Sequence, residues 1–213
     1  MAMNNKEILI QGLATLGQPL TSNQHQQLLD YVALLQKWNK TYSITAITAA
    51  DKMISYHVLD SLTLLPRLAD AATQKLLDVG SGGGMPGIPL AIARPDLAIT
   101  LLDSNQKKTS FLRQAILELG LKNVTVETCR VEHCTALAHF DVITSRAFAS
   151  LNDFVSLTRH LLAKEGCYWA MKGLYPTEEL AELPADVQMT KLLAVQSPNV
   201  EGERHLIQLR IVP

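Results

Sequence analysis

The sequence predicts an α/β fold, in which a Rossmann-like parallel sheet ends in an antiparallel C-terminal hairpin and is preceded by an N-terminal helical extension. Three observations predict this class. Strand-like runs alternate with helical runs from residue 75 to residue 172, a pattern typical of parallel strands joined by right-handed crossovers. Two further strand-like runs lie near the C-terminus, and the first 70 residues show helical periodicity only.

Three helices are expected in the extension, which we place at residues 1–70 and expect to pack on a single unit formed by residues 71–213. Apolar residues recur there at helical spacing, and capping residues, glycine or proline mark the ends. The expected helices are 4–16, ended by Gly17; 22–38, capped by Ser22; and 51–64, capped by Asp51 and followed by Pro66.

The alternating region begins with the run Lys75–Gly80, which predicts a buried strand that ends in a glycine-rich turn. We expect Gly120 and Gly166 to end the two longer helices that follow. The expected strands are 75–80, 98–103, 124–129, 140–145 and 167–172, and the expected helices are 87–94, 105–120 and 151–163.

The last two strand-like runs, 187–195 and 205–212, are separated only by the loop SPNVEGER. So short a link cannot form a parallel crossover, so the two runs should pair antiparallel. A two-domain NAD dehydrogenase does not end in this way. The hairpin is the ending expected of the class I S-adenosylmethionine-dependent methyltransferase version of the Rossmann fold.

Composition and charge restrict the function. The chain has 213 residues, of which 47% are hydrophobic, and this excludes a disordered protein. Lys and Arg total 19 and Asp and Glu total 20, which gives a net charge of −1 and excludes a polycation that binds nucleic acid without specificity. A local basic face remains compatible with this balance.

Cysteine usage predicts a reduced protein. Cys129, Cys134 and Cys167 form an odd set without a CxxC spacing, so we expect neither a disulfide framework nor a zinc finger, and no metal. The N-terminus does not resemble a signal peptide, and no apolar run approaches the roughly 18 residues of a membrane span. We therefore expect a cytoplasmic protein without a membrane partner.

The glycine-rich turn carries the strongest functional signal. Five of the eleven glycines lie between residues 80 and 87, and Gly80, Gly82 and Gly84 follow a G-x-G-x-G pattern between a strand and a helix. This context is typical of nucleotide binding. A tight turn without a ligand is the alternative, but a single glycine would serve that purpose.

Asp103 ends the second strand, 19 positions after Gly84, where a carboxylate can accept hydrogen bonds from both ribose hydroxyls of NAD, FAD or S-adenosylmethionine. Asp78 favours S-adenosylmethionine, because a carboxylate suits an ammonium group better than a pyrophosphate. Glu132 is a candidate for adenine recognition, with Val131 against the ring; its alternative role is an exposed carboxylate at a helix start.

The segment Thr144–Ser150 should face the transferred methyl group. It lacks the Asn/Asp-Pro-Pro-Tyr/Phe motif of exocyclic amine methylation, and none of the three cysteines follows proline, as pyrimidine C5 methylation would require. Guanine N7 has its own lone pair and needs no general base. Arg146 could orient a phosphate or a guanine edge, and its alternative role is a surface salt bridge.

Motifs along nearly the whole chain resemble those of the bacterial small-subunit rRNA guanine-N7 methyltransferases, which are also called the glucose-inhibited division protein B family. The combination is more specific than the glycine turn alone. The matching segments are Lys37–Thr45, His57–Ser61, Asp78–Pro89, Leu101–Ser104, Arg130–Glu132, Ser145–Leu151, Met171–Gly173 and Gly202–His205.

The resemblance implies a cytoplasmic enzyme that methylates N7 of one guanosine in a decoding-region loop of 16S rRNA, with S-adenosyl-L-methionine as cofactor and S-adenosyl-L-homocysteine as product. Loss of this methyl group is associated in the family with altered aminoglycoside sensitivity. Asp103 matches the family's acidic position, and Met85 replaces a common leucine with conserved volume. The implied cofactor contacts are Gly80, Met85, Val131, Glu132 and Arg146.

Basic residues near the predicted carboxyl ends of strands are candidates for RNA contact, although each could be only a solvated charge. They are Lys107, Lys108, Arg113, Arg130, Lys172 and Arg204. His57, Asp60 and Ser61 mimic a hydrolase triad, but their spacing places them on one helix. We expect His57 and Asp60 to tie the extension to the cofactor domain instead.

Two other functions are also compatible with the sequence. One is a non-catalytic sensor that binds an adenosine ligand together with RNA or the ribosome, and the other is an NAD-dependent oxidoreductase. The preferred hypothesis is the 16S rRNA methyltransferase, a monomer whose partner is 16S rRNA or the small ribosomal subunit.

Overall fold

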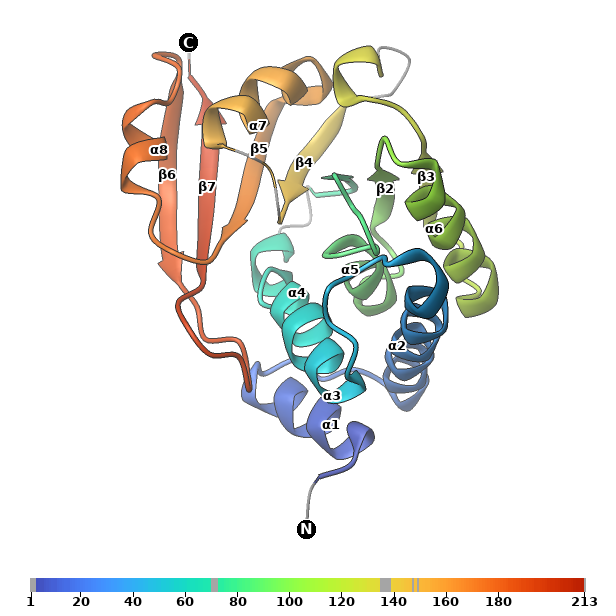
Figure 1. Cartoon of the computed structure of the whole chain (residues 1–213). Coiled ribbons are helices and arrows are strands. Elements are labelled where there is room, and N and C mark those ends of the chain that lie inside the picture. The colour runs from blue at the N-terminus through green and yellow to red at the C-terminus, as the bar shows by residue number, and fades with distance from the viewer. Residues whose placement is uncertain (1–2, 70–72, 135–138, 147, 149, 213) are drawn as a thin grey trace.

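The computed structural model describes residues 3–69, 73–134, 139–146, 148 and 150–212. These residues form a seven-stranded mixed sheet with strand order β3-β2-β1-β4-β5-β7-β6 and helices on both faces (Figure 1). The predicted α/β sheet with a C-terminal hairpin is confirmed. The strands are β1 Lys75–Val79, β2 Ala98–Leu102, β3 Val124–Glu127, β4 Phe140–Ser145, β5 Leu162–Lys172, β6 Val187–Ala194 and β7 His205–Ile211.

Parallel pairing brings the carboxyl ends of the central strands to one edge of the sheet. Val79 lies opposite Leu102 on β2, and Asp78 lies opposite Thr144 on β4. β3 continues the parallel part beyond β2, and β5 continues it beyond β4. The turns that follow these strands therefore share the edge at which open α/β sheets bind ligands.

The C-terminal hairpin is antiparallel, as its short connection predicts. β6 pairs with β7, and β7 pairs in turn with β5. This pairing sets Lys172, the last residue of β5, opposite His205, the first residue of β7. The segment before β7 therefore reaches the same edge as the carboxyl ends of the parallel strands.

Neighbouring side chains along a strand point to opposite faces of the sheet. Both faces of this sheet carry buried apolar side chains, and helices cover both. Leu76 belongs to a core shared with the N-terminal helices, α5 (Gly87–Ala93) and α6 (Gln106–Leu119). Leu77 belongs to a second core, which is shared with α7 (Leu151–Thr158). In Figure 1 the blue N-terminal helices lie on the same side as α5 and α6.

The extension is helical, as predicted, but two of its caps differ from the expected ones. Thr21 caps α2 in place of Ser22, because its hydroxyl accepts the Gln24 N–H while the Gln24 side chain accepts the Thr21 N–H. Ala49 precedes α3 in place of Asp51, which lies inside the helix. The elements are α1 Asn5–Thr15, α2 Ser22–Tyr42, α3 Ala50–Met53, η1 Ile54–Leu59, α4 Asp60–Leu62 and η2 Leu65–Leu68.

Two of these helices also differ in length or type from the prediction. α2 continues to Tyr42 and ends where Ser43 takes a left-handed conformation, with φ of 50°. The expected single α-helix over residues 51–64 contains a π-helical segment, η1, at its centre. π-Helical segments are rare in proteins, and those that occur often lie at functional sites.

The boundary between α7 and β5 was predicted incorrectly. α7 ends at Thr158, and β5 begins at Leu162, so Gly166 lies inside the strand and does not end the helix. The pairing of β4 with β5 is irregular at this point. A Cβ at Gly166 would lie 3.0 Å from the Phe140 carbonyl oxygen, so close backbone packing explains the glycine.

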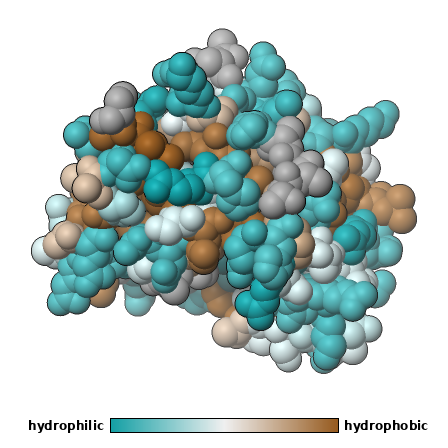
Figure 2. Space-filling view, turned by 90° about the horizontal axis from the view of Figure 1, so that it is seen from above, coloured by the Kyte–Doolittle hydropathy of each residue, from teal (hydrophilic) through white to brown (hydrophobic). Residues whose placement is uncertain are grey.

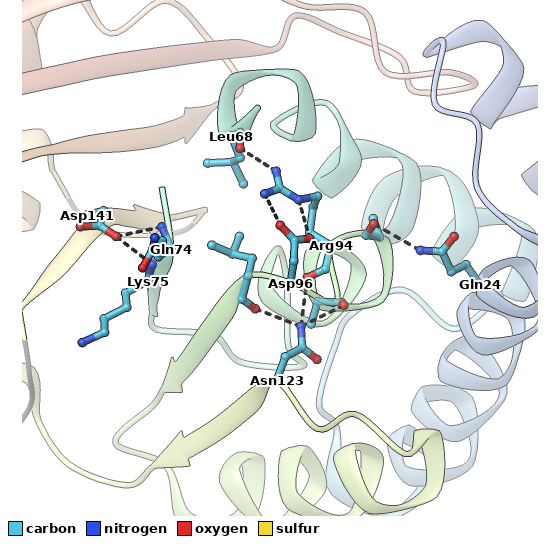
Figure 3. Close-up of polar contacts among 11 residues, drawn as sticks. Gln24, Leu68, Gln74, Lys75, Arg94, Asp96, Asn123 and Asp141 are labelled. Atoms are coloured by element: carbon cyan, nitrogen blue, oxygen red, sulfur yellow. Dashed lines mark hydrogen bonds and ion pairs between the residues drawn. The ribbon is translucent and has the colours of Figure 1, made fainter. Parts of the chain in front are cut away.

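The C-terminal end of α5 is held by side chains from several segments (Figure 3). Gln24 of α2 donates to the Ile92 and Ala93 carbonyls, and Arg94 donates to the Leu68 carbonyl at the end of the extension. Three further carbonyls of this region accept the Asn123 side-chain amide. These bonds satisfy carbonyls that a helix end leaves free, and they join the extension to the sheet region.

Cys129 and Cys134 form a disulfide, so the expected absence of disulfides is wrong for this pair. Their Cα atoms lie 6.5 Å apart, because the chain turns after β3 into the short helix η3 (Val131–His133). The five-residue separation matches no metal or redox spacing, and so the pattern did not reveal the pair. Cys167 is free and buried, and burial raises the pKa of its thiol.

Hydrophilic residues cover much of the upper face of the molecule, with hydrophobic residues between them (Figure 2). Within the described residues, no helix combines the length and the apolar character that a membrane span requires. Nor does this part of the chain contain a group of three or more His, Cys, Asp or Glu side chains that could hold a metal ion.

Candidate functional site

A tight turn joins β1 to α5 at the carboxyl edge of the sheet. It is fastened to β2, because the backbone N–H groups of Gly80 and Ser81 donate to the Leu102 carbonyl at 2.8 and 3.0 Å. Gly84 has a φ of 92°, and a Cβ there would lie 2.5 Å from Cδ1 of Ile88. The turn itself therefore requires glycine at this position.

Two other glycines of the turn border open space. Among the described residues, no atom lies within 4 Å of a Cβ built at Gly80, and a Cβ at Gly82 would meet only the Gly80 carbonyl oxygen, at 3.8 Å. Bare backbone beside open space allows a ligand to approach the chain closely. The turn therefore fits a nucleotide or a related adenosine-type cofactor.

Asp103, the residue after β2, directs its buried carboxylate to this turn. One oxygen, Oδ2, accepts the Gly82 N–H at 2.9 Å, and the other, Oδ1, accepts the Asn105 N–H at 2.8 Å. The Lys108 ammonium lies 3.9 Å from Oδ2. These contacts fix the carboxylate, while each oxygen retains acceptor capacity for a ribose hydroxyl.

Asp78 lies fully buried beneath the turn. Its Oδ2 accepts the Gly87 N–H at 2.9 Å, whereas Oδ1 has no partner among the described residues. Burial raises the pKa of Asp78 to about 7, and the bond from Gly87 opposes that shift. An acceptor without a partner at this place favours a ligand that carries a cation or a donor, which fits the ammonium group of S-adenosylmethionine.

Tyr31 of α2 supports the turn from the extension and is a residue that the sequence analysis missed. Its hydroxyl donates to the Gly83 carbonyl at 2.6 Å, and burial raises the pKa of the phenol, which therefore stays a neutral donor. A Cβ at Gly83 would clash with Cε of Met85 at 2.8 Å. Helical periodicity alone marks Tyr31 only as a core position, so the pattern gave no sign of this contact.

The two candidate adenine contacts lie on η3, after β3. Val131 is buried and belongs to the same hydrophobic core as Val79 and Leu102, the last residues of β1 and β2. Glu132 is exposed on η3. The disulfide between Cys129 and Cys134 encloses both residues, so it limits the conformations that this segment can adopt.

Arg146, the residue after β4, connects the turn to the extension. Its Nη1 donates to the Tyr56 carbonyl at 2.8 Å and lies 3.8 Å from the Asp60 carboxylate. Its Nη2 lies 3.3 Å from Nδ1 of His57 and 3.5 Å from the Met85 sulfur. Arg146 is therefore a partly buried junction, and the predicted role of His57 and Asp60 in joining the extension to the sheet is confirmed.

His57 is neutral at physiological pH. Burial, and then the charge of Arg146, lower its pKa to about 4. Since Nδ1 faces the Arg146 donor, the ring proton belongs on Nε2, which lies 2.8 Å from the Thr45 hydroxyl. Both ring nitrogens thus have partners, an arrangement that suits a structural group rather than a proton carrier.

A cavity of about 320 Å³ adjoins Arg146, between the extension and the C-terminal hairpin. Polar side chains from both parts line it, and Ile47, Met171 and Val195 add apolar wall. The polar side chains that line it, besides Arg146, are Tyr56, His57, Asp60, Thr63, Lys172, Arg204 and His205.

The structure divides the candidate RNA contacts into two groups. Lys172 and Arg204 line this cavity with Arg146; Lys172 pairs with Glu179 at 2.8 Å, and Arg204 with Asp60 at 3.1 Å. The other four follow β2 and β3, on the opposite side of β1 and β4. They are Lys107, Lys108, Arg113 and Arg130, of which Arg113 donates to Thr128 and the Val126 carbonyl.

Comparison of the sequence with known proteins agrees with the resemblance described above. The family model described as rRNA small subunit methyltransferase G matches residues 24–207. The chain is 58% identical over 201 residues to the ribosomal RNA small subunit methyltransferase G of Chromobacterium violaceum, a match that covers 94% of this chain and 95% of that protein. It is 54% identical over 208 residues to the enzyme of the same name from Neisseria meningitidis serogroup B, covering 97% and 99%.

Solved structures resemble the fold at low sequence identity. TrmN from Thermus thermophilus has a TM-score of 0.56 at 19% identity, covering 75% of this chain and 53% of that one. A complex of DhpI with SAH has a TM-score of 0.56 at 16% identity, covering 89% and 97%. At such identities the likeness shows the fold alone, which is that of the class I S-adenosylmethionine-dependent methyltransferases.

Proposed function

The chain belongs to the rRNA small subunit methyltransferase G family, a family of S-adenosylmethionine-dependent methyltransferases, and from this premise we propose that it methylates N7 of a guanosine in a decoding-region loop of 16S rRNA. One observation supports the proposal above the others. The glycine turn and Asp103, joined by the Gly82 hydrogen bond, lie at the carboxyl edge of the sheet, and Arg146 reaches Met85 of the same turn from the end of β4.

The cofactor site consists of residues with separate tasks. The open backbone at Gly80 and Gly82 accepts the cofactor closely, Asp103 binds the ribose hydroxyls, and Asp78 attracts the ammonium end. Val131 and Glu132 hold the adenine, and Gly84 shapes the turn.

When bound, the cofactor would supply an electrophilic methyl group. The lone pair of N7 forms the new C–N bond, and the C–S bond breaks with its electrons left on sulfur. The positive charge passes from the sulfur to the purine.

Guanine N7 suits this site because the transfer requires no proton to be removed. His57, the histidine beside Arg146, has a pKa of about 4 and uses both ring nitrogens within the protein. The chain then contributes by positioning and electrostatics, as a reaction without a general base requires. Arg146 is the residue we assign to positioning, since it touches both Met85 and the neighbouring cavity.

Recognition of the RNA is assigned to the two basic groups on either side of the central strands. Together they are Lys107, Lys108, Arg113, Arg130, Lys172 and Arg204. The net charge of −1 favours recognition of a structured partner, the small ribosomal subunit, over binding to arbitrary RNA. Further parts of the proposal are a monomeric state, a cytoplasmic location and the family's link between this methyl group and aminoglycoside sensitivity.

The test uses small ribosomal subunits from a strain that lacks the modification. After incubation with the protein and S-adenosylmethionine, nuclease digestion and mass spectrometry should detect 7-methylguanosine at one 16S rRNA position, with many turnovers per enzyme. Arg146→Ala should lower kcat/KM by about 100-fold or more, the cost of misplacing reacting groups. The variant also loses its bonds to Tyr56 and Asp60, so its Tm should fall, and the activity is therefore measured at a temperature at which the variant is fully folded. A wild-type protein that forms no 7-methylguanosine, or methylates another atom, would contradict the proposal.

A further inference from the structure

The cavity beside Arg146 is not part of the predicted cofactor site. Besides Arg146, its lining comes from the helical extension, the ends of β5 and β6 and the start of β7, whereas the other predicted cofactor contacts lie at the end of β1 or follow β1, β2 and β3. Arg146 is shared, because it lines the cavity and its Nη2 also lies 3.5 Å from the sulfur of Met85 in the glycine turn. A molecule in the cavity would therefore lie next to the cofactor but on other elements of the fold.

Asp60 holds two arginines at the wall of this cavity. Its carboxylate is buried, with Oδ1 3.1 Å from Nε of Arg204 and Oδ2 3.8 Å from Nη1 of Arg146. One negative charge thus faces two positive charges, whereas the nearby Lys172 is paired with Glu179 at 2.8 Å. The cluster has an excess of positive charge and of N–H donors, since each guanidinium carries five.

The cavity combines these donors with apolar wall. Met171 and Val195 are among its lining residues, together with Ile47 of the extension. A volume of about 320 Å³ lies at the lower end of the range for small-molecule sites and suits one nucleoside, not a duplex. Apolar surface for a base and arginine donors for an oxygen or phosphate are the features that bind an extruded nucleotide.

We propose that this cavity receives the target guanosine, extruded from its RNA loop, and that Asp60 positions Arg204 and Arg146 to bind the nucleotide's phosphate and guanine O6. The inference rests on the proposed function, of which it specifies the substrate site. Guanine presents two acceptors on one edge, O6 and N7. N7 must stay free to react, so the arginine donors are assigned to O6 and the phosphate.

The test compares two arginines at opposite ends of β7. Arg204→Gln removes the guanidinium at the cavity, just before β7. Arg210→Gln is the matched control, because Arg210 lies near the far end of β7 and, among the described residues, donates only to the Glu165 carbonyl. Three measurements are made on each full-length protein: the Kd for S-adenosylhomocysteine by calorimetry, kcat and KM for methylation of small ribosomal subunits, and NMR shifts during titration with guanosine 5′-monophosphate in the presence of S-adenosylhomocysteine.

We expect Arg204→Gln to raise the KM for the subunit at least tenfold and leave the S-adenosylhomocysteine Kd within twofold of wild type. The nucleotide should shift resonances of cavity residues in the wild type and the Arg210→Gln control, and Arg204→Gln should abolish these shifts. An Arg204→Lys variant should recover part of the lost activity. Adenosine 5′-monophosphate tests the base: shifts of equal size would overturn the assignment of O6.

The outcomes separate this inference from the proposed function. If the wild type forms 7-methylguanosine but Arg204→Gln retains its KM and its nucleotide shifts, the cavity is not the guanosine site, although the proposed function stands. If Arg204→Gln folds but loses S-adenosylhomocysteine binding, the cavity belongs to the cofactor site and the inference is overturned. If the nucleotide binds as expected but the wild type forms no 7-methylguanosine, the proposed function fails while the nucleotide cavity remains supported.

Discussion

The carboxylate of Asp103 accepts a hydrogen bond from the backbone N–H of Gly82 at 2.9 Å, and this contact links the end of β2 to the glycine turn after β1. If the same carboxylate binds a ribose, Asp103→Asn should raise the Kd for S-adenosylmethionine about tenfold or more. A charge-assisted hydrogen bond is worth about 1.5–3 kcal/mol, and the amide cannot accept from two hydroxyls through two oxygens. Calorimetry measures the effect directly. Asp30→Asn, at an exposed position of α2, is the control, and equal affinities of the two variants would contradict the assignment.

Tyr31→Phe tests whether the extension stabilises the turn. The substitution removes the hydroxyl that donates to the Gly83 carbonyl and leaves that carbonyl without this partner. We expect a loss of about 1–3 kcal/mol in the free energy of unfolding, which lowers the Tm by about 2–4 °C per kcal/mol in a protein of this size. Tyr42→Phe, on the exposed end of the same helix, should change the Tm by less than about 1 °C. Equal shifts for both variants would contradict the role of Tyr31.

Local patterns predicted the parts of the site that are close in sequence or joined by parallel strand ends. The turn after β1, Asp103 after β2 and Arg146 after β4 meet because parallel strands share one edge, a rule that needs only strand order. Tyr31 was missed because it reaches Gly83 across 52 positions through helix packing, which apolar periodicity does not specify.

Boundary errors arose where two residues satisfied the same local rule. Thr21 and Ser22 are both good caps, and only the reciprocal bond with Gln24 decides between them.

The disulfide depends on the turn between β3 and η3, which brings Cys129 and Cys134 together. The cavity beside Arg146 joins the extension to the hairpin, so no single segment of sequence could reveal it.

The disulfide predicts a specific alkylation pattern. Iodoacetamide added to the denatured, unreduced protein should modify Cys167 alone, and reduction beforehand should expose Cys129 and Cys134. Mass spectrometry of the peptides distinguishes these patterns. Cys134→Ser should cost at most about 2 kcal/mol of stability, because the closed loop is short and little chain entropy is removed. Modification of all three cysteines without reductant would show that the pair is not bonded in solution.

His57 predicts a loss of stability on acidification. Its pKa is about 4 in the folded protein and about 6.5 in the unfolded chain, so between these values the unfolded chain binds a proton that the folded protein does not. The contribution of His57 is therefore complete above pH 6.5 and is lost as the pH falls towards 4. Between pH 7 and pH 5 this amounts to about 2 kcal/mol.

Asp78 acts in the opposite direction over part of this range. Its raised folded pKa, about 7, means that its protonated form stabilises the fold at low pH and that this contribution is lost as the pH rises from about 3.8 to 7. His57→Gln isolates the histidine, because Asp78 is common to both proteins. Urea unfolding at pH 7 and pH 5 should show a pH-dependent loss about 2 kcal/mol smaller in His57→Gln than in the wild type. Identical losses would contradict a neutral, buried His57.

A double-mutant cycle tests whether Asp60 acts through Arg204. Asp60→Asn removes the carboxylate that lies 3.1 Å from Nε of Arg204, so the guanidinium keeps its charge but loses the group that orients it. If Asp60 is a positioning residue, Asp60→Asn should raise the KM for the small ribosomal subunit, and Asp60→Glu should restore part of the loss. The double variant with Arg204→Gln should be little worse than the worse single variant, because both remove one interaction. Fully additive losses in kcat/KM would show that the two side chains act independently, and the contact between them would then be structural only.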